Sequence, residues 1–184
     1  VPPPQVAART VAPEIAETYL KARAELDRMT AEGIGNALRH FREINLKAPD
    51  FAPGLALHSA CLFMLGYWGH APAAEVYPGA KHLALQAVAV DDGLATAHLV
   101  LAWMDLLLDW DLAAAMREVR RAIELSPSDP DAHSFHSTLL CFAGDKAEAT
   151  REVHYALKLN PASLLPNQCA AWMFLHLGQH ARAE

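Results

Sequence analysis

Ten histidines stand out among the 184 residues, because histidine can bind a metal or transfer a proton near neutral pH. A zinc site needs three or four converging nitrogen or sulfur donors. Four histidines could converge if the helices that carry them pack together: His58, His98, His133 and His136. Their spacing matches no recognisable ligand pattern. Interhelical histidines with satisfied hydrogen bonds are therefore the preferred interpretation, with a histidine metal site as the third hypothesis.

The remaining reactive side chains do not form a catalytic pattern. Cys61, Cys141 and Cys169 lie among apolar residues and outside any CxxC pair, which predicts small buried side chains. Asp109 and Asp111 flank Trp110, but acid–base catalysis needs a cleft and a partner group. Asp111 is expected to cap a helix, with Trp110 packed over the turn. With no GxSxG or glycine-rich phosphate loop, we expect no enzyme activity and no cofactor.

Composition excludes two further classes of function. The net charge is −6, whereas a nucleic-acid-binding face needs a basic surplus. The mean hydropathy is +0.08, and no apolar run reaches the ~18 residues of a membrane span. An odd count of three cysteines, none of them in a CxxC pair, favours a reducing, cytoplasmic location. The Pro-rich start predicts a linker over residues 1–12, and the helical pattern at the end suggests a piece of a longer protein.

The elements that must position these side chains repeat along the chain. Ala37, Ala80, Ala115, Ala149 and Ala183 recur at steps of 43, 35, 34 and 34 residues. Two further series follow the same irregular steps. They are Ser59, Ala102, Ser137 and Ala171, and Pro49, Asp92, Pro127 and Pro161. A common period of 34 residues indicates a repeat protein whose units stack on one another.

The pattern predicts two helices in each repeat, and the clearest repeat runs over residues 130–163. Asp129 is a candidate N-cap before Pro130, and Gly144 ends the first helix. Asp145 then has the spacing of a capping box with Glu148. The extra residues near 66–78 predict a loop with one short helical turn near residues 71–76.

Small residues at positions 8, 20 and 27 and proline at position 32 of a 34-residue unit resemble the tetratricopeptide repeat. Position 27 holds Ile44, Ala87, Ala122 and Ala156. Position 4, usually aromatic in the family, departs from it with Leu20, Leu55, His98, His133 and Asn167. The resemblance implies an all-α, right-handed superhelical solenoid of antiparallel helix pairs. It covers residues 13–184, as four full repeats and a truncated fifth.

A narrower resemblance involves the stretch EGIGNALRHFREINLKAPDFAPGLA, the turn at residues 109–111 and RRAIELSPSDPDAH. These phrases resemble the tetratricopeptide region that follows a winged-helix or adenylate cyclase domain in bacterial regulators. The resemblance implies a regulatory or sensory role in a larger signalling or transcription-regulating protein. It places neither DNA binding nor cyclase chemistry on any residue of this chain.

In such a solenoid the first helix of each pair lines the concave side, which implies an apolar and aromatic groove. Its expected exposed residues are Ala60, Phe63, Met64, Trp103, Leu106, Leu107, Thr138, Cys141, Phe142, Trp172, Leu175 and His176. The family's basic set for a peptide C-terminal carboxylate is missing from these positions. An amphipathic helix or apolar peptide fits such a groove better.

The sequence thus predicts a non-catalytic module for protein–protein interaction. The partner would be a protein or peptide, with neither nucleic acid nor membrane bound by this segment. The main alternative is self-association into a homodimer through the apolar groove or the truncated fifth repeat. A linker, another domain or a second copy could also fill the groove.

Overall fold

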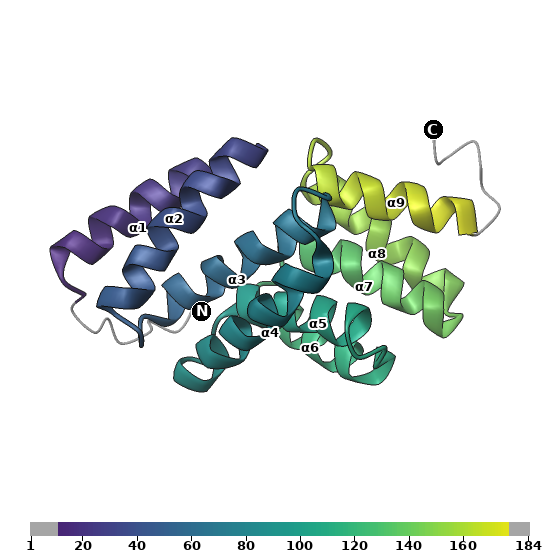
Figure 1. The fold of residues 1–184 in the computed structure, drawn as a ribbon. Coiled ribbons are helices and arrows are strands. Elements are labelled where there is room, and N and C mark those ends of the chain that lie inside the picture. Colours follow the sequence, from purple (N-terminus) through teal and green to yellow (C-terminus); the bar gives the residue numbers. More distant parts are fainter. Residues whose placement is uncertain (1–10, 177–184) are drawn as a thin grey trace. The chain divides into compact units, whose positions relative to one another are not determined.

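The computed structural model describes residues 11–176, and every regular element in that range is an α-helix (Figure 1). The nine helices of this range are α1 (Pro13–Leu26), α2 (Ala31–Lys47), α3 (Ala52–Tyr67), α4 (Ala73–Val90), α5 (Ala95–Leu107), α6 (Leu112–Leu125), α7 (Pro130–Ala143), α8 (Lys146–Leu159) and α9 (Leu164–His176). Most of the predicted linker, the end of the fifth repeat and Ala183 lie outside the described residues.

The chain divides into two compact units, residues 1–104 and 105–184. In the first unit α1 packs on α2, α2 on α3, and α3 on α4. In the second, α7 contacts α6, α8 and α9, and α8 also contacts α9. Contact between α7 and α9 joins the first helices of successive repeats. The predicted all-α repeat of antiparallel helix pairs is confirmed.

Local signals at the helix ends explain where several helices begin and stop. The Asp111 carboxylate accepts a hydrogen bond from the Ala114 amide at 2.8 Å, and Asp145 accepts one from Glu148 at 3.1 Å. Asp129 caps α7 before Pro130, as predicted. Gly144 ends that helix with a φ of 85°, in the left-handed region that glycine adopts most easily.

Small residues mark the close approaches between helices, also as predicted. Seven are fully buried: Ala37, Ser59, Ala80, Ala102, Ala115, Ser137 and Ala149. Larger side chains such as Phe41 and Val153 fill the space around them and are equally buried. A small side chain lets two helix axes approach to the near end of the usual 8–10 Å range. These series therefore predict packing rather than a binding surface.

The residues expected to form a loop near 66–78 are mostly helical, which corrects that prediction. Helix α3 continues to Tyr67 and α4 begins at Ala73. A Cβ on Gly66 would lie 2.4 Å from a Tyr77 ring carbon, so the two long helices cross where only glycine fits. Tyr77 is buried and stacks against Phe63 with centroids 6.3 Å apart. This aromatic contact fixes the lengthened hairpin.

The prediction that Trp110 packs over its turn is wrong. Its side chain is 85% exposed, and its φ of 55° is left-handed. The Asp111 amide donates to the Asp105 carbonyl six residues earlier at 2.9 Å, which closes the turn around Trp110. Trp110 thus takes the position usually given to glycine, and its ring lies in solvent.

Candidate functional site

The groove residues predicted in the first unit form its core instead of an exposed surface. Phe63 and Trp103 are 5% and 4% exposed, and their rings stack with centroids 5.1 Å apart. Ala60 is buried and Met64 is partly buried. Because the helices are longer here than expected, aromatic side chains that would have faced a partner pack on one another.

The groove residues predicted in the second unit divide into buried and exposed sets. Thr138 is buried, whereas four others are partly buried: Leu106, Leu107, Cys141 and Trp172. Phe142, Leu175 and His176 are exposed. Phe142 and Trp172 lie 4.9 Å apart between ring centroids, and Trp172 lies 3.8 Å from His176. The structure thus brings together an aromatic patch of Phe142, Trp172 and His176 on α7 and α9, in which Phe142 and His176 are exposed and Trp172 is partly buried.

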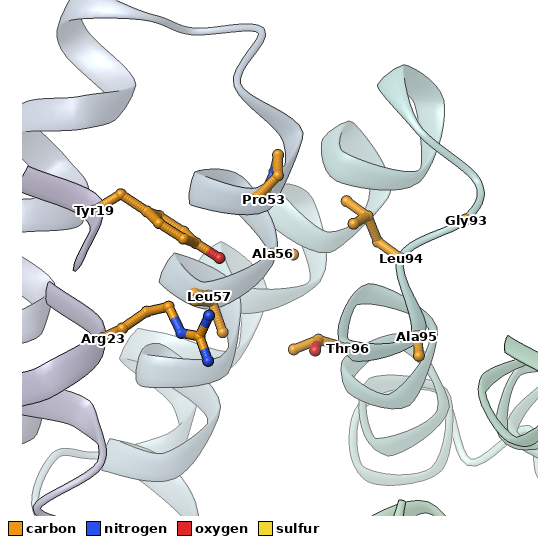
Figure 2. A pocket seen from close by; sticks show the side chains of 9 residues that line it. All are labelled: Tyr19, Arg23, Pro53, Ala56, Leu57, Gly93, Leu94, Ala95 and Thr96. Carbon is orange, nitrogen blue, oxygen red and sulfur yellow. The ribbon is translucent and has the colours of Figure 1, made fainter. Parts of the chain in front are cut away.

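A cavity of about 300 Å³ lies within the first unit, between α1, α3 and the start of α5 (Figure 2). Tyr19 and Arg23 extend into it from α1. Its other walls are formed by Pro53, Ala56, Leu57, Gly93, Leu94, Ala95 and Thr96. These are the first helices of three successive repeats, so the cavity lies on the side that the resemblance assigns to a partner.

Tyr19 is held in this cavity by its neighbours. Its ring contacts Phe41 and Phe51 edge-on, with centroids 6.2 and 5.3 Å apart. Burial raises the pKa of its hydroxyl, and the Arg23 guanidinium acts in the opposite direction. The phenol therefore stays protonated near neutral pH and can donate a hydrogen bond. With Arg23 one turn further along α1, the cavity offers donors and a positive charge on one wall.

The groove predicted from the sequence does not include this cavity, because it starts one helical turn too late along α3. Pro53, Ala56, Ala60 and Phe63 follow one another at helical spacing, so they share a face of α3. The predicted groove occupies the later part of this face, which aromatic packing buries. Its earlier part is lined by small side chains and lies open toward Tyr19 and Arg23. Following the helical face backwards from Phe63 would have found it.

Polar side chains in the first turns of three helices bond to the turn that precedes each helix. The His98 Nε2 lies 3.1 Å from the Asp92 carbonyl, and the His133 Nε2 lies 3.0 Å from the Pro127 carbonyl. The Asn167 amide donates to the Pro161 carbonyl at 3.0 Å. All three side chains occupy position 4 of a repeat and reach the carbonyl six residues earlier. A polar tie to the preceding turn thus replaces the aromatic residue usual in the family.

The remaining candidates for chemistry have structural roles. His58 lies 2.7 Å from the Asn45 amide, and its burial and the Arg42 charge lower its pKa to about 4. Burial raises the pKa of the Cys61 thiol to about 12, so it stays protonated. Within residues 11–176, no three histidine, cysteine or acidic side chains converge in a geometry that suits a metal ion.

Comparison with known proteins agrees on the fold. The sequence matches no family model and no curated protein. Among solved structures, TTC0263, a thermophilic TPR protein of Thermus thermophilus, matches with a TM-score of 0.65 and 19% identity, over 89% of this chain and 81% of its own. MamA of Desulfovibrio magneticus RS-1 matches with a TM-score of 0.59 and 15% identity, over 94% and 90%.

A third structure extends the comparison to a protein with a described ligand site. YrrB, a TPR protein with an unusual peptide-binding site, matches with a TM-score of 0.54 and 15% identity, over 90% of this chain and 79% of its own. None of the helices described for this chain is long and apolar enough to cross a membrane. At these identities the similarity is one of architecture. The described helices have the tetratricopeptide-repeat fold.

Proposed function

We propose that this chain is a non-catalytic protein-interaction module that holds a peptide segment of a partner against the first helices of its repeats. The cavity between α1, α3 and α5 carries the proposal. It is open, it lies on one side of three successive repeats, and it combines apolar walls with polar groups. Sites for ligands share these properties.

The lining of the cavity indicates which peptide would fit. Pro53, Leu57 and Leu94 offer apolar contact, and Tyr19 and Arg23 offer hydrogen-bond donors beside a positive charge. An apolar side chain of the partner would fill the space, with an acidic side chain one helical turn away facing Arg23. The partner segment is then amphipathic, as expected for a peptide that lies along helices.

Selection of peptides from a random library on the full chain tests this proposal. We expect selected peptides to combine apolar and acidic residues. In fluorescence anisotropy, Arg23→Glu should weaken their binding about tenfold, as a reversed charge contact of ~1–2 kcal/mol would. Arg39→Glu, on the exposed face of α2, is the matched control and should bind normally. Selected peptides that bind Arg23→Glu as tightly as the original chain would place the site elsewhere.

The finer role proposed for this module is regulatory. Resemblance of the phrases at residues 32–56 and 120–133 to bacterial regulators supports a sensory segment of a larger cytoplasmic signalling protein. The test is the reading frame upstream of Val1. A DNA-binding or cyclase domain there would support the role, and a frame that holds only further repeats would support a free scaffold.

Self-association is the second candidate function, and the aromatic patch of the second unit favours it. Phe142 and Leu175 are 52% and 51% exposed, so large apolar side chains of α7 and α9 reach a surface that a second copy of the chain could cover. Sedimentation equilibrium should show a dimer that the Phe142→Ser variant loses. A strict monomer at high concentration would exclude this function and leave the peptide-binding proposal untouched.

A further inference from the structure

The side chain of His133 connects two parts of the second unit that are not adjacent in sequence. Its Nδ1 lies 2.6 Å from the Glu152 Oε2 on α8, and its Nε2 lies 3.0 Å from the Pro127 carbonyl in the turn between α6 and α7. Both partners are acceptors. Each ring nitrogen must therefore carry a proton for both hydrogen bonds to exist, and only the charged imidazolium carries two.

We propose that His133 is a protonation-dependent tie between the α6–α7 turn and α8, which holds both ends when its ring is charged and releases one when the ring is neutral. A neutral ring keeps a single N–H. Its other nitrogen would then present a lone pair to a carboxylate or a carbonyl oxygen, which is repulsive. The link between the α6–α7 turn, α7 and α8 is thus tight at mildly acidic pH and looser at alkaline pH.

The groups around the His133 ring favour its charged form, but the ring can still lose its proton as the pH rises. Burial, the strongest influence, acts to lower the pKa of His133, but hydrogen bonds to Glu152 and Pro127 and the charges of Glu152 and Asp129 together raise it. Tyr155 on α8 packs edge-on against the ring, with centroids 4.7 Å apart. On α7 itself, the His136 Nδ1 lies 3.6 Å from the other oxygen of Glu152, beyond hydrogen-bond distance.

Glu152 remains an anion throughout the range in which His133 titrates. Its burial acts to raise the pKa, but His133 and His136 outweigh burial and lower the value to about 2. Within the pair of His133 and Glu152, the charge that changes is therefore that of His133. Since its pKa is raised, the stabilisation is complete below about pH 6.5, the ordinary value for histidine, and is lost as the pH rises through the folded value.

The next repeat supplies the uncharged form of the same tie. Asn167 occupies the position of His133 and donates to the Pro161 carbonyl at 3.0 Å. An asparagine amide has no titration in this range. The variant His133→Asn therefore keeps the donor to Pro127 and removes the charge, which makes it the matched control.

Asp131 is the nearby group most easily confused with this effect. Its burial and the Asp129 charge raise its pKa to about 6, so its folded form also loses stability as the pH rises. That loss begins near its ordinary value of 3.8 and is largely over by pH 7. The His133 tie changes at higher pH, and Asp131→Asn separates the two.

Two NMR measurements on the full chain test the proposal. In the first, the ring nitrogens of His133 should show the imidazolium at pH 6 and titrate above 6.5. This measurement needs no variant, so it decides the matter even if the variants fail to fold. A ring that is neutral at pH 6 would overturn the proposal. Glu152→Gln should move the titration to lower pH.

The second measurement is amide hydrogen exchange in the turn, corrected for the intrinsic effect of pH. Between pH 6 and 9, protection of the Asp129, Asp131 and Ala132 amides should fall roughly threefold or more in the original chain and in Asp131→Asn. The same protection should stay constant in His133→Asn. A constant profile in the original chain, or an equal fall in His133→Asn, would contradict the tie.

Discussion

Two helix pairs of the same fold are held together in different ways. In the first unit α3 and α4 have 16 and 18 residues and meet through aromatic rings and a close approach at Gly66. In the second unit α7 and α8 have 14 residues each, and the ion pair of His133 with Glu152 joins them. Dispersion and apolar burial do not depend on pH, whereas an ion pair does. One architecture can thus contain both a constant and a responsive joint.

The two phenylalanines from the predicted groove give the largest expected contrast. Phe63→Ala should lower the free energy of unfolding by about 3–5 kcal/mol, because it empties a packed aromatic cluster. Phe142→Ala removes a side chain that is 52% exposed and should lower the free energy of unfolding by only about 0.5 kcal/mol. Urea unfolding followed by circular dichroism measures both. Similar losses from the two variants would contradict the division into core and surface.

Two glycines of the first unit test the close approach between α3 and α4. In Gly66→Ala the new methyl group would meet the Tyr77 ring, so the variant should lose about 1–3 kcal/mol of stability. Gly35→Ala adds the same group inside α2, where nothing lies within 4 Å, and should gain about 0.5–1 kcal/mol. Thermal unfolding of the pair compares identical chemical changes. A stable Gly66→Ala would mean that the α3–α4 crossing is looser than described.

Unfolding at acidic pH should distinguish the pH-dependent contact between α7 and α8 from the pH-independent contact between α3 and α4. The folded pKa of Glu152 is about 2, below its ordinary 4.5, so its stabilisation is present above pH 4.5 and is lost as the pH falls toward 2. Glu152→Gln should lack this loss, which we expect to be on the order of 1 kcal/mol. Unfolding midpoints at pH 3 and 5 measure it. An unchanged difference between these midpoints in the variant would remove Glu152 as the cause.

The smallest effect expected is at the helix caps. Asp145→Ala should lower the free energy of unfolding by about 0.5–1 kcal/mol, because the Glu148 amide at the exposed start of α8 loses its acceptor. Helix α3 has no side-chain cap and begins with Pro53 in its first turn, so the same kind of change is not available there. Asp145→Asn should retain most of the stability.

Sequence alone predicted the features that depend on neighbours along the chain. Asp129, Gly144 and Asp145 act over three or four residues, and the small residues at the crossings recur with the repeat. Predictions that failed depend on contacts between helices. Whether Phe63 lies in a groove or a core is decided by Tyr77 and Trp103, which are distant in sequence. Trp110 is exposed because the turn is left-handed at this residue, and no glycine in the turn indicates that conformation.

The candidate cavity was harder to foresee for a related reason. Tyr19 and Arg23 become important only when α1 is placed opposite α3, and neither residue has a distinctive spacing. His58 and His133 bond to a neighbouring helix, as expected, whereas His136 is buried and neither of its ring nitrogens has a hydrogen-bond partner. The bonds of His98 and His133 to carbonyls six residues earlier could not be predicted, because every residue type has a backbone carbonyl.

The ties at position 4 also bear on how such a protein can change over evolutionary time. Codons for histidine and asparagine differ by one base. The side chains of His98, His133 and Asn167 all reach the carbonyl of the preceding turn. A single nucleotide exchange can therefore replace an ionisable side chain at position 4 by a neutral one that keeps the same hydrogen bond. Selection can thus adjust the pH response of each tie without changing the rest of the repeat.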